Sequence, residues 1–451
     1  MIIVDSYRCA YCGGCVSVCP VDALMLAETR LIVNADCIDC GNCVLACPAG
    51  ALQPQDAEHA IQQRRRQVQR EYDLVVVGAG PGGATAARVA AQAGLSVLLL
   101  EKRQEIGSPV RCAEGVGRDQ LTSFIEPDPR WISAEVSQAE ITCVADGSQR
   151  TMRAAGGRGY VLERRVFDRA LAERAAQAGA EVRVKTAATG LLIEEGHMCG
   201  VRIGRGDFFT GPGEVQVRAR VVIAADGVES QVGRWANLNL QLPLEDTMVC
   251  AQYLLAGVKI DPTCTSYTIS HEIAPGGYAW IFPKGEGKAN VGLGVQADLP
   301  ALAGRPGWRV GATKLRAETA MDYLNRFIES HPALAQGYPV TLIAGNVPVA
   351  PSPSRIVTDG LMLVGDAGRQ VDPLTGGGIL NAMTAGTLAA QVAVEAIATG
   401  DTSATFLSRY EEQWRASTGR KLQRNYRLRQ RFPPTQRTDE HFVRAFALAA
   451  K

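Results

Sequence analysis

A repeated cysteine motif near the N-terminus constrains this chain more than any other feature of its sequence. The segments CAYCGGCVSVCPVDAL, starting at Cys9, and CIDCGNCVLACPAGAL, starting at Cys37, share the spacing C-x2-C-x2-C-x3-C-P. Together they hold eight of the 13 cysteines. So dense a cluster is typical of metal binding, because a reducing compartment disfavours disulfides. In each copy three thiolates suit one corner of an iron–sulfur cube, and the fourth cysteine belongs to the other cube.

This segment resembles a bacterial-type ferredoxin over residues 1–56. The pattern predicts two 4Fe–4S clusters. One cluster has the ligands Cys9, Cys12, Cys15 and Cys47, and the other has Cys37, Cys40, Cys43 and Cys19. A pair of zinc sites is the alternative, but zinc ribbons usually separate two C-x2-C pairs and lack the third cysteine and the trailing proline.

Length and composition predict a large globular protein. At roughly 150 residues per domain, 451 residues correspond to about three domains. Hydrophobic residues make up 46% of the chain and charged residues 21%, which excludes disorder and fibrous repeats. Because 47 Lys and Arg residues balance 46 Asp and Glu residues, a globally basic nucleic-acid binder is excluded, and we expect no nucleic-acid partner.

We expect a cytoplasmic protein. No apolar run approaches the roughly 18–20 residues of a membrane span, and the cysteine motif begins at Cys9, which leaves no room for a secretory signal. Charge is uneven locally: residues 1–56 contain six acids and two arginines, whereas Arg415–Arg437 contains eight basic residues and no acid. This basic segment is a solvated helix face, a docking surface for the acidic module, or a surface for anionic lipid headgroups or a substrate diphosphate. With lipid headgroups, the protein would bind the cytoplasmic membrane face peripherally.

A dinucleotide-binding pattern follows the polar residues 57–71, which we interpret as a linker. The apolar strand predicted at Leu74–Val77 leads into Gly-Ala-Gly-Pro-Gly-Gly, a small-residue helix and a second strand at Val97–Leu100. This order predicts a Rossmann-type site, in which the glycines form the turn, admit the pyrophosphate and pack the helix on the strand. Glu101 closes the second strand and can accept hydrogen bonds from a ribose. The glycines concerned are Gly78, Gly80, Gly82 and Gly83.

A second signature favours FAD over NAD as the dinucleotide. The strand predicted at Leu361–Val364 ends close to Asp366, which can hold ribityl hydroxyls. The glycine run that follows opens a helix whose N–H groups can face the flavin. This run contributes Gly377, Gly378 and Ile379. A further strand-to-turn signature, between the two, contains Asp226.

Together these segments resemble the p-hydroxybenzoate-hydroxylase-like FAD superfamily over about residues 71–400. The resemblance implies a Rossmann-like FAD domain combined with a β-sheet substrate domain. It places Arg165 where the family commonly contacts FAD, and the alternative is a plain ion pair of Arg165 with Asp168 at a helix start. It also implies cofactor contacts from Lys102, Arg111, Cys112, Ala113, Gly115 and Ala188.

Two segments are similar to the geranylgeranyl reductase branch of this superfamily. The loop Gly107–Gly115 carries Cys112 in a Pro-x-x-Cys-x-x-Gly pattern, which in that family lies near the flavin ring. The segment YAWIFPK, from Tyr278 to Lys284, matches Y-x-W-x-F-P-K. Strand alternation puts its aromatic rings on one face, where they would wall an isoprenoid channel. We therefore take Cys112, Tyr278 and Trp280 as candidate catalytic residues. The alternatives are aromatics that fill the sheet core and a cysteine that is an inert buried residue.

The predicted fold class is α/β (α+β). A two-cluster ferredoxin module and a linker would precede a discontinuous Rossmann-like FAD domain, an antiparallel β-sheet substrate domain and a basic helical C-terminal segment. The expected boundaries are 1–56 for the module, 57–71 for the linker, 72–170, 215–240 and 355–400 for the FAD domain, 241–354 for the substrate domain and 401–451 for the C-terminal segment.

The resemblance implies a reductase that saturates geranylgeranyl-type C=C bonds of a lipid, quinone or pigment. A low-potential external donor, a ferredoxin or similar protein, would feed electrons through the two clusters to FAD. FAD would deliver hydride to the alkene and an acid would add the proton. Two alternatives remain: an electron-transfer flavoprotein of the quinone oxidoreductase kind, and a flavin monooxygenase, which needs oxygen. The order of the fused domains and the Y-x-W-x-F-P-K match favour the reductase.

Overall fold

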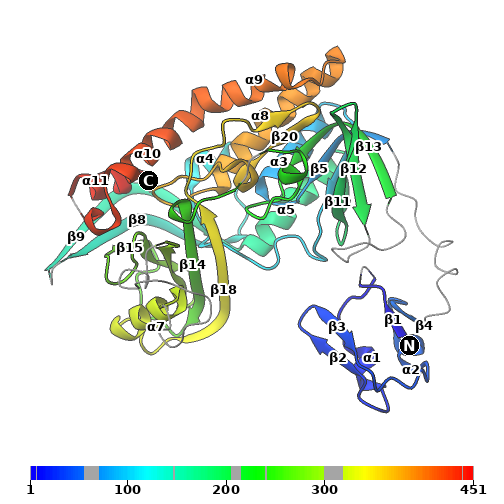
Figure 1. The fold of residues 1–451 in the computed structure, drawn as a ribbon. Helices are drawn as coiled ribbons and strands as arrows, with labels where there is room; N and C mark the ends of the chain where they lie inside the picture. The colour runs from blue at the N-terminus through cyan, green and yellow to red at the C-terminus, as the bar shows by residue number, and fades with distance from the viewer. Residues whose placement is uncertain are drawn as a thin grey trace, which may run out of the picture.

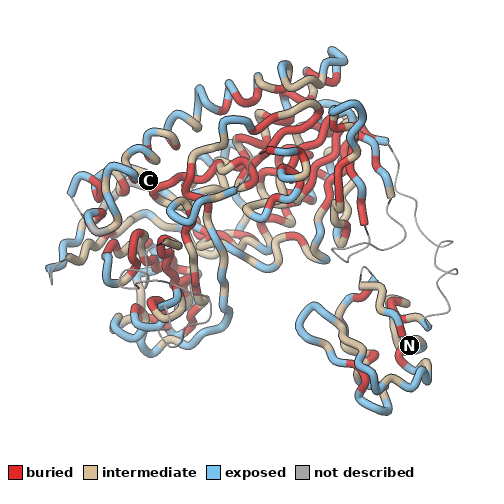
Figure 2. The backbone as a smooth tube through the Cα atoms, in the orientation of Figure 1, coloured by how far each residue is buried: buried red, intermediate tan, exposed pale blue. Residues whose placement is uncertain are grey.

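The computed structural model describes residues 2–6, 8–54, 71–145, 148–204, 215–238, 241–298, 318–438 and 440–449. The expected linker, apart from Glu71, lies outside these ranges. Figure 1 shows a small N-terminal module set apart from a larger body that contains two extended sheets and ends in a row of C-terminal helices. In Figure 2 the buried backbone is concentrated in the larger body, and much of the module is exposed or intermediate.

The N-terminal module repeats its architecture as it repeats its cysteines. Its outer strands β1 and β4 pair antiparallel, and so do β2 and β3. Each short helix starts after a left-handed glycine, Gly13 with φ 75° and Gly41 with φ 78°. Few apolar side chains are buried here, so the module has only a small apolar core of its own. The elements are β1 (Ile2–Val4), α1 (Gly14–Ser17), β2 (Leu24–Ala27), β3 (Arg30–Val33), α2 (Asn42–Ala46) and β4 (Leu52–Pro54).

A mostly parallel sheet forms the centre of the α/β part. Its spatial order is β10-β6-β5-β13-β12-β11, with β20 beside β13 and β19 beside β20. Neighbouring strands are parallel from β10 to β13, and β13 is also parallel to β20. Parallel sheets are usually covered on both faces, which explains why a strand such as β6 is apolar at every position. The strands are β5 (Glu71–Val77), β6 (Val97–Leu100), β10 (Glu181–Arg183), β11 (Ala187–Glu194), β12 (His197–Gly204), β13 (Val215–Ala224), β19 (Val357–Thr358) and β20 (Leu361–Leu363).

Two helices rich in small residues, α3 (Pro81–Gln92) and α8 (Ile379–Thr399), pack against each other. A Cβ atom added to Gly386 would lie 2.3 Å from the carbonyl oxygen of Gly82, so the two backbones are in direct contact. Among the described helices, α8 alone is long and apolar enough to cross a bilayer, yet 56% of its most apolar window is buried in the protein. It is therefore a core helix. The other short elements are α4 (Arg118–Thr122), α5 (Arg164–Gln177), α6 (Val232–Trp235) and η3 (Gly365–Gly368).

The second sheet has the order β18-β14-β17-β16-β15-β8-β9-β7 and is antiparallel except between β15 and β8. Helix α7 (Ala320–Ser330) covers part of it with Tyr323, Leu324 and Phe327, and a capping box of Thr319 with Asp322 begins that helix. The elements are β7 (Gly115–Gly117), β8 (Ile132–Ala145), β9 (Ser148–Leu162), η2 (Leu244–Asp246), β14 (Thr247–Ala256), β15 (Cys264–Ile269), β16 (Tyr278–Pro283), β17 (Lys288–Gln296) and β18 (Tyr338–Pro348).

The two sheets divide the chain differently from the expected domain boundaries. Strands β7, β8 and β9 lie inside the range 72–170 expected for the FAD domain, but they belong to the second sheet. Strands β10, β11 and β12, in a range for which we predicted no domain, join the parallel sheet. Local motifs mark the phosphate turns, whereas pairing between distant strands such as β13 and β5 leaves no local signal in the sequence.

The C-terminal segment is helical, as predicted, but its basic residues are not all on a solvated face. Arg429 and Arg437 are 5% and 6% exposed, and each donates to Oε1 of Gln296 at 2.9 Å. Figure 1 shows these helices far from the N-terminal module, so among the described residues nothing supports the segment as a docking surface for that module. The elements are α9 (Ala404–Trp414), η4 (Arg415–Gly419), α10 (Arg420–Arg431), η5 (Pro434–Gln436) and α11 (Glu440–Ala449).

Candidate active site

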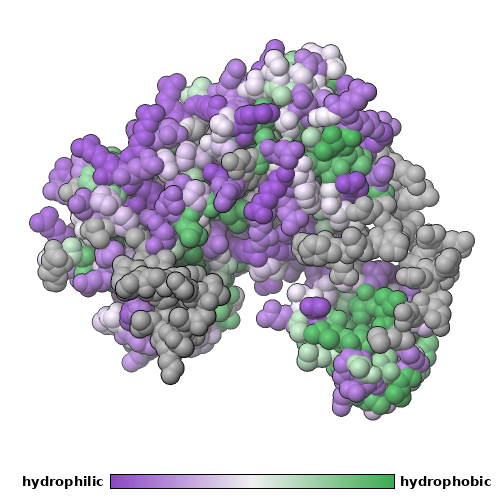
Figure 3. Space-filling view, viewed as in Figure 1, coloured by the Kyte–Doolittle hydropathy of each residue, from purple (hydrophilic) through white to green (hydrophobic). Residues whose placement is uncertain are grey.

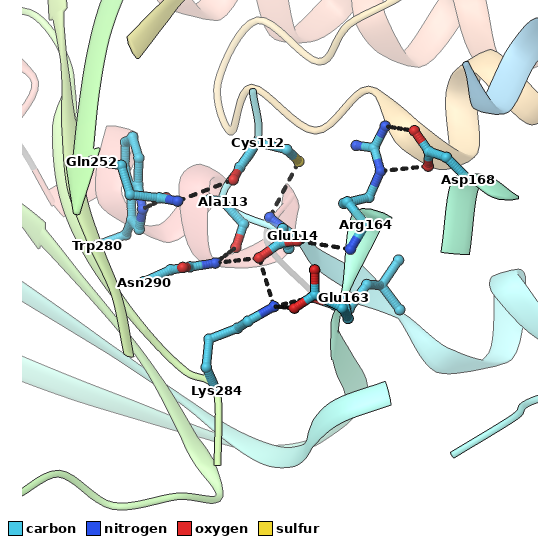
Figure 4. Close-up of polar contacts among 11 residues, drawn as sticks. Cys112, Ala113, Glu114, Glu163, Arg164, Asp168, Gln252, Trp280, Lys284 and Asn290 are labelled. Carbon is cyan, nitrogen blue, oxygen red and sulfur yellow. Dashed lines mark hydrogen bonds and ion pairs between the residues drawn. The ribbon is translucent and has the colours of Figure 1, made fainter. Parts of the chain in front are cut away.

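A buried carboxylate, Glu114, fixes the loop that carries Cys112. Glu114 is 3% exposed and has a left-handed backbone with φ 75°. Its carboxylate accepts hydrogen bonds from the backbone N–H of Arg164 at 2.8 Å, from Nδ2 of Asn290 at 2.6 Å and from Nζ of Lys284 at 2.7 Å (Figure 4). These three donors come from α5, from β17 and from the turn after β16. The loop is therefore held from three directions.

Lys284, the last residue of the Y-x-W-x-F-P-K segment, is the charge partner of Glu114. The two side chains are 5% and 4% exposed, and Lys284 also bonds the carbonyl oxygen of Leu162 and lies 3.3 Å from Glu163. These acceptors offset the cost of removing the Lys284 ammonium from water. The second sheet and the Cys112 loop are thus joined by an ion pair that water scarcely reaches.

A hydrogen-bonded chain connects Cys112 with Trp280. The carbonyl oxygen of Cys112 accepts from Nε2 of Gln252 at 3.1 Å, and Oε1 of Gln252 accepts from Nε1 of Trp280 at 2.8 Å (Figure 4). Asn290 donates to the next carbonyl, that of Ala113, at 3.1 Å. Two candidate catalytic residues predicted from separate motifs therefore lie at one site.

Tyr278 links the same sheet to the glycine loop that precedes α8. Its hydroxyl donates to the carbonyl oxygen of Thr375, and its ring lies 5.8 Å from that of Trp280. Burial raises the pKa of Tyr278 well above its usual value, so the phenol stays protonated. Phe282 belongs to the same apolar cluster as Trp280. Gly115 leaves room for the Phe282 ring, because a Cβ atom on residue 115 would lie 2.9 Å from that ring. The aromatic residues share one face, as alternation predicted.

The thiol of Cys112 stays protonated near neutral pH. Burial raises its pKa, and the nearby Arg164 guanidinium opposes that shift without cancelling it. Arg164 in turn forms a two-point ion pair with Asp168 at 2.8 and 2.9 Å. The alternative of an ion pair between Arg165 and Asp168 is therefore wrong: Arg164 takes that position, while Arg165 is 54% exposed and lies 3.7 Å from Glu105.

The first glycine loop has the shape that a dinucleotide site needs. A Cβ at Gly83 would lie 1.9 Å from the carbonyl oxygen of Gly78, so only glycine allows the helix to start this close to β5. Gly80, by contrast, faces open space where a pyrophosphate can approach the start of α3. Glu101 accepts from the backbone N–H groups of Ala79 at 3.2 Å and Arg103 at 2.9 Å, beside this loop.

The second flavin signature also forms a polar site. Asp366 lies at the start of η3. Burial raises the pKa of its carboxyl group, although the positive charge of Arg164 acts in the opposite direction. Its Oδ1 lies 3.5 Å from the place that a Cβ atom on Gly378 would occupy. Gly378 caps the N-terminus of α8, where Ile379 begins the helix. In the middle signature, Oδ1 of Asp226 is buried and has no hydrogen-bond partner among the described residues, which suits a ligand hydroxyl. These residues fit FAD.

Two predicted cofactor contacts, Lys102 and Arg111, meet at a carboxylate that the motifs did not reveal. Glu229 accepts from Nζ of Lys102 at 2.8 Å and pairs with Arg111 at 2.5 Å. The hydrogen bonds from Lys102 and Arg111 lower the pKa of Glu229 to about 2. Ala188 lies on β11 opposite Ile203, and no polar contact of its own marks it as a cofactor residue in the described part of the chain.

The eight cysteines of the module line two separate cavities. One is lined by Cys19, Cys37, Cys40 and Cys43, and the other by Cys9, Cys12, Cys15 and Cys47. These are the two predicted ligand sets. Each cavity is lined by four cysteine thiols, the ligand set of a 4Fe–4S cluster. The cavities fit iron–sulfur clusters.

A side-chain contact joins the module to the larger body. Nζ of Lys185 donates to the hydroxyl of Tyr11 at 2.9 Å and lies 4.0 Å from the centre of its ring. Tyr11 stands between Cys9 and Cys12, and Lys185 follows β10 next to the strand end that holds Glu101. The contact therefore lies at the adenosine end of the expected FAD site.

Three family models match this chain. The model described as “4Fe-4S dicluster domain” matches residues 1–48. The models described as “NAD(P)-binding Rossmann-like domain” and “Geranylgeranyl reductase catalytic domain” match residues 76–116 and 246–304. Digeranylgeranylglycerophospholipid reductases from Methanosphaerula palustris and Methanosarcina acetivorans are 48% and 51% identical to it, over 80% and 77% of this chain and 86% and 81% of theirs. The chain belongs to the geranylgeranyl reductase family.

Solved structures agree with membership of the geranylgeranyl reductase family. A geranylgeranyl bacteriochlorophyll reductase-like protein from Thermoplasma acidophilum is 40% identical with a TM-score of 0.74, over 85% of this chain and 92% of that chain. A flavin-dependent brominase, 18% identical with a TM-score of 0.63 over 84% of this chain and 94% of its own, shows the fold alone. The predicted family, fold class and ferredoxin-type module are confirmed, and the chain is an FAD-dependent reductase of this family.

In this member of the geranylgeranyl reductase family, the residues that sequence reasoning missed are those that hold the site together. Glu114 is an unspecified position of the Pro-x-x-Cys-x-x-Gly pattern, Lys284 is the last residue of Y-x-W-x-F-P-K, and Arg164 directly precedes Arg165. Gln252 and Asn290 lie in strands without a motif. The alternation of β14 and β17 would have placed both on one face, but nothing local indicates a buried polar side chain.

We predict that Lys284→Met lowers the free energy of unfolding by about 3–5 kcal/mol, because it leaves the Glu114 carboxylate buried without its partner. Lys288→Met is the matched control, since Lys288 and its partner Glu286 are 42% and 85% exposed, and it should cost about 0.2–1 kcal/mol. Denaturant unfolding of both variants measures the difference. Equal losses would show that the buried pair adds nothing to stability.

Proposed function

We propose that this chain saturates geranylgeranyl-type C=C bonds of a glycerophospholipid, using electrons that pass through its own N-terminal module. The observation that carries the proposal is the link between the aromatic face and both flavin loops: Trp280 is joined through Gln252 to Cys112, and Tyr278 to Thr375. This arrangement connects an aromatic cluster with both flavin loops, and an isoprenoid chain requires such apolar contacts. The names of the relatives supply the lipid class.

Each part of the site has one task in this proposal. When bound, FAD would supply hydride to the alkene and the clusters would supply electrons to it. Asp226, Asp366 and the start of α8 would hold the ribityl chain and the ring. Trp280 and Tyr278 exclude water and position the alkene. Cys112 keeps its proton near neutral pH and is placed to donate it to the second carbon.

Two 4Fe–4S clusters are supported by the two separate thiol-lined cavities. We predict that Cys12→Ala lowers the iron content by about half while FAD stays bound, because Cys12 lines only one of the cavities. Cys199→Ala, a change of a cysteine on β12 outside the module, is the control and should leave iron unchanged. Iron analysis and flavin absorption provide the readout. A variant that lost all its iron would contradict two independent cluster sites.

The proposal also covers the partners and the location of the protein. A low-potential external donor is supported by the fused module, since the clusters need a source of electrons. Peripheral contact with the cytoplasmic face of a membrane is supported by the edge strand β18, where Tyr338, Val340 and Leu342 are 61%, 56% and 56% exposed. A lipid substrate would reach the site from such a surface.

The alternatives share parts of this site but not all of it. A quinone oxidoreductase would also join FAD to iron–sulfur groups, but the relatives carry the name of a lipid reductase. A monooxygenase would share the fold, which is common to the halogenases among the structural neighbours. It would have no use for eight thiols in two cavities. The reductase uses every feature described.

Mass spectrometry of membrane lipids tests the proposal. A host that makes unsaturated geranylgeranyl glycerophospholipids would express the chain under anaerobic conditions. Added pairs of hydrogens on the isoprenoid chains are expected, and Cys12→Ala should reduce their yield. Unaltered lipids together with a reduced quinone pool would support the quinone alternative, and hydroxylated products that require oxygen would support the monooxygenase.

We predict that Cys112→Ala retains FAD but slows alkene reduction by about 100-fold, within the range of roughly 10²–10⁴ that a positioned proton donor contributes. Cys264→Ala removes a buried thiol from β15, away from the loop, and serves as the control. Turnover of the purified proteins with dithionite as reductant gives the comparison. Turnover of Cys112→Ala equal to wild type would assign Cys112 a packing role.

A further inference from the structure

The two cluster cavities have different surroundings. The cavity of Cys9 and Cys12 is also lined by Tyr11, the residue that contacts Lys185 of the larger body. Among the described residues, the lining of the cavity of Cys37 and Cys40 makes no side-chain hydrogen bond or ion pair to that body. Its ligand Cys40 and its lining residue Ile38 are exposed. The module is therefore asymmetric although its sequence repeats.

Exposed apolar side chains flank the ligands of the cavity of Cys37 and Cys40. Ile38, which lines it, is 61% exposed, and Val21, which also lines it, is 37% exposed. Val18 precedes Cys19 and is 37% exposed, and Leu45 follows Cys43 by two residues and is 89% exposed. Figure 3 shows a broad apolar area on the visible face of the module. Water contact with so many large apolar groups is unfavourable, and such patches commonly mark protein contacts.

The arginines of the module lie at one cavity only, where Asp5 and Glu28 accompany them. The exposed carboxylates of Asp22 and Asp36 lie beside the ligands Cys19 and Cys37. The two arginines of the module lie at the other cavity: Arg8 is next to Cys9, and Arg30 is next to Leu31, which lines that cavity. The apolar patch therefore has an acidic rim without a basic residue of the module in it.

We propose that Val18, Val21, Ile38 and Leu45, with Asp22 and Asp36, form the docking face for the external electron donor. Its partner is a redox protein whose own docking face is apolar with a basic rim, and not another acidic ferredoxin. Electrons enter at the Cys37 cavity and leave toward the body from the Cys9 cavity. One-electron transfer oxidises the donor's group and reduces the nearer cluster, with no bond made or broken. This inference rests on the proposed internal relay.

The proposed partner follows from charge complementarity. Acidic and basic rims attract over about 10 Å at moderate salt, which speeds encounter, whereas two acidic faces repel. An apolar centre then excludes water at the contact, as in other transient redox complexes. Both conditions are met at this face and not at the opposite cavity, where Tyr11 is already engaged.

Anaerobic stopped-flow measurements on the holoprotein test the inference. The probes are two reduced donors of opposite surface charge, a basic ferredoxin–NADP⁺ reductase and an acidic bacterial-type ferredoxin, with dithionite as a small reductant. The variants are Ile38→Glu and Leu45→Glu. The matched control is Met25→Glu, since Met25 is 57% exposed on β2 and alternates with Leu24 and Leu26, which line the cavities.

We expect the basic donor to reduce the clusters at least tenfold faster than the acidic donor at low salt, with a rate that falls as salt rises. Ile38→Glu and Leu45→Glu should each slow this step at least tenfold, and Asp22→Asn with Asp36→Asn should flatten its salt dependence. Met25→Glu, and every variant with dithionite, should react as wild type, which also shows that the clusters are intact.

Three results would overturn the inference: faster reduction by the acidic donor, equal slowing by Met25→Glu, or variants that keep the donor rate but slow electron transfer from the clusters to the flavin. The last result would assign the face to the chain's own flavin domain. None of these measurements uses the lipid, so failure of the docking face and failure of the proposed function are distinguishable.

Discussion

The buried ion pair of Glu114 with Lys284 is the interaction on which the arrangement of this site depends. It joins the loop of Cys112, which follows the FAD-binding strands, to the strand that carries Trp280 and Tyr278 in the second sheet. Two charges removed from water remain stable only when nearby donors and acceptors satisfy them, and here Asn290, Arg164 and Leu162 do so. The pair therefore fixes the loop of Cys112 against the second sheet.

Other contacts cross the same boundary. The amide of Gln252 bridges Trp280 and the Cys112 carbonyl, and the hydroxyl of Tyr278 donates to the carbonyl oxygen of Thr375. Each group has a fixed orientation, and the site is prepared before any ligand arrives. An apolar substrate gains little from hydrogen bonds, so a rigid apolar wall is the means by which the protein can position it.

The sequence was most informative where chemistry demands a fixed local spacing. The cysteine repeat, the turn from Gly78 to Gly83 and the Y-x-W-x-F-P-K segment indicated the right family and fold class, because a cluster, a pyrophosphate and a strand face each impose a short pattern. Domain boundaries were less predictable, since β8 pairs with β15 from a distant segment, and β9 joins the same sheet through β8. The ion pairs could not be predicted, because neighbouring Arg164 and Arg165 differ only in the helix face they occupy.

The position of the module poses the main physical question about electron flow. Tyr11 contacts the body at the adenosine end of the expected FAD site, whereas Cys112 and Trp280 define the end where the alkene would react. An internal relay needs the clusters to reduce the ring faster than turnover, through this contact or from another copy of the chain. The protein's task is then to couple two distant redox groups.

The most direct measurement is a single anaerobic mixing experiment on the reduced holoprotein. With clusters and flavin fully reduced and no further donor present, an unsaturated geranylgeranyl glycerophospholipid is added and both absorption bands are followed. The account predicts that the flavin is oxidised first, the clusters then lose their electrons, and saturated lipid forms in proportion. A flavin that stays reduced in the presence of the alkene, or clusters that keep their electrons while product forms, would contradict it.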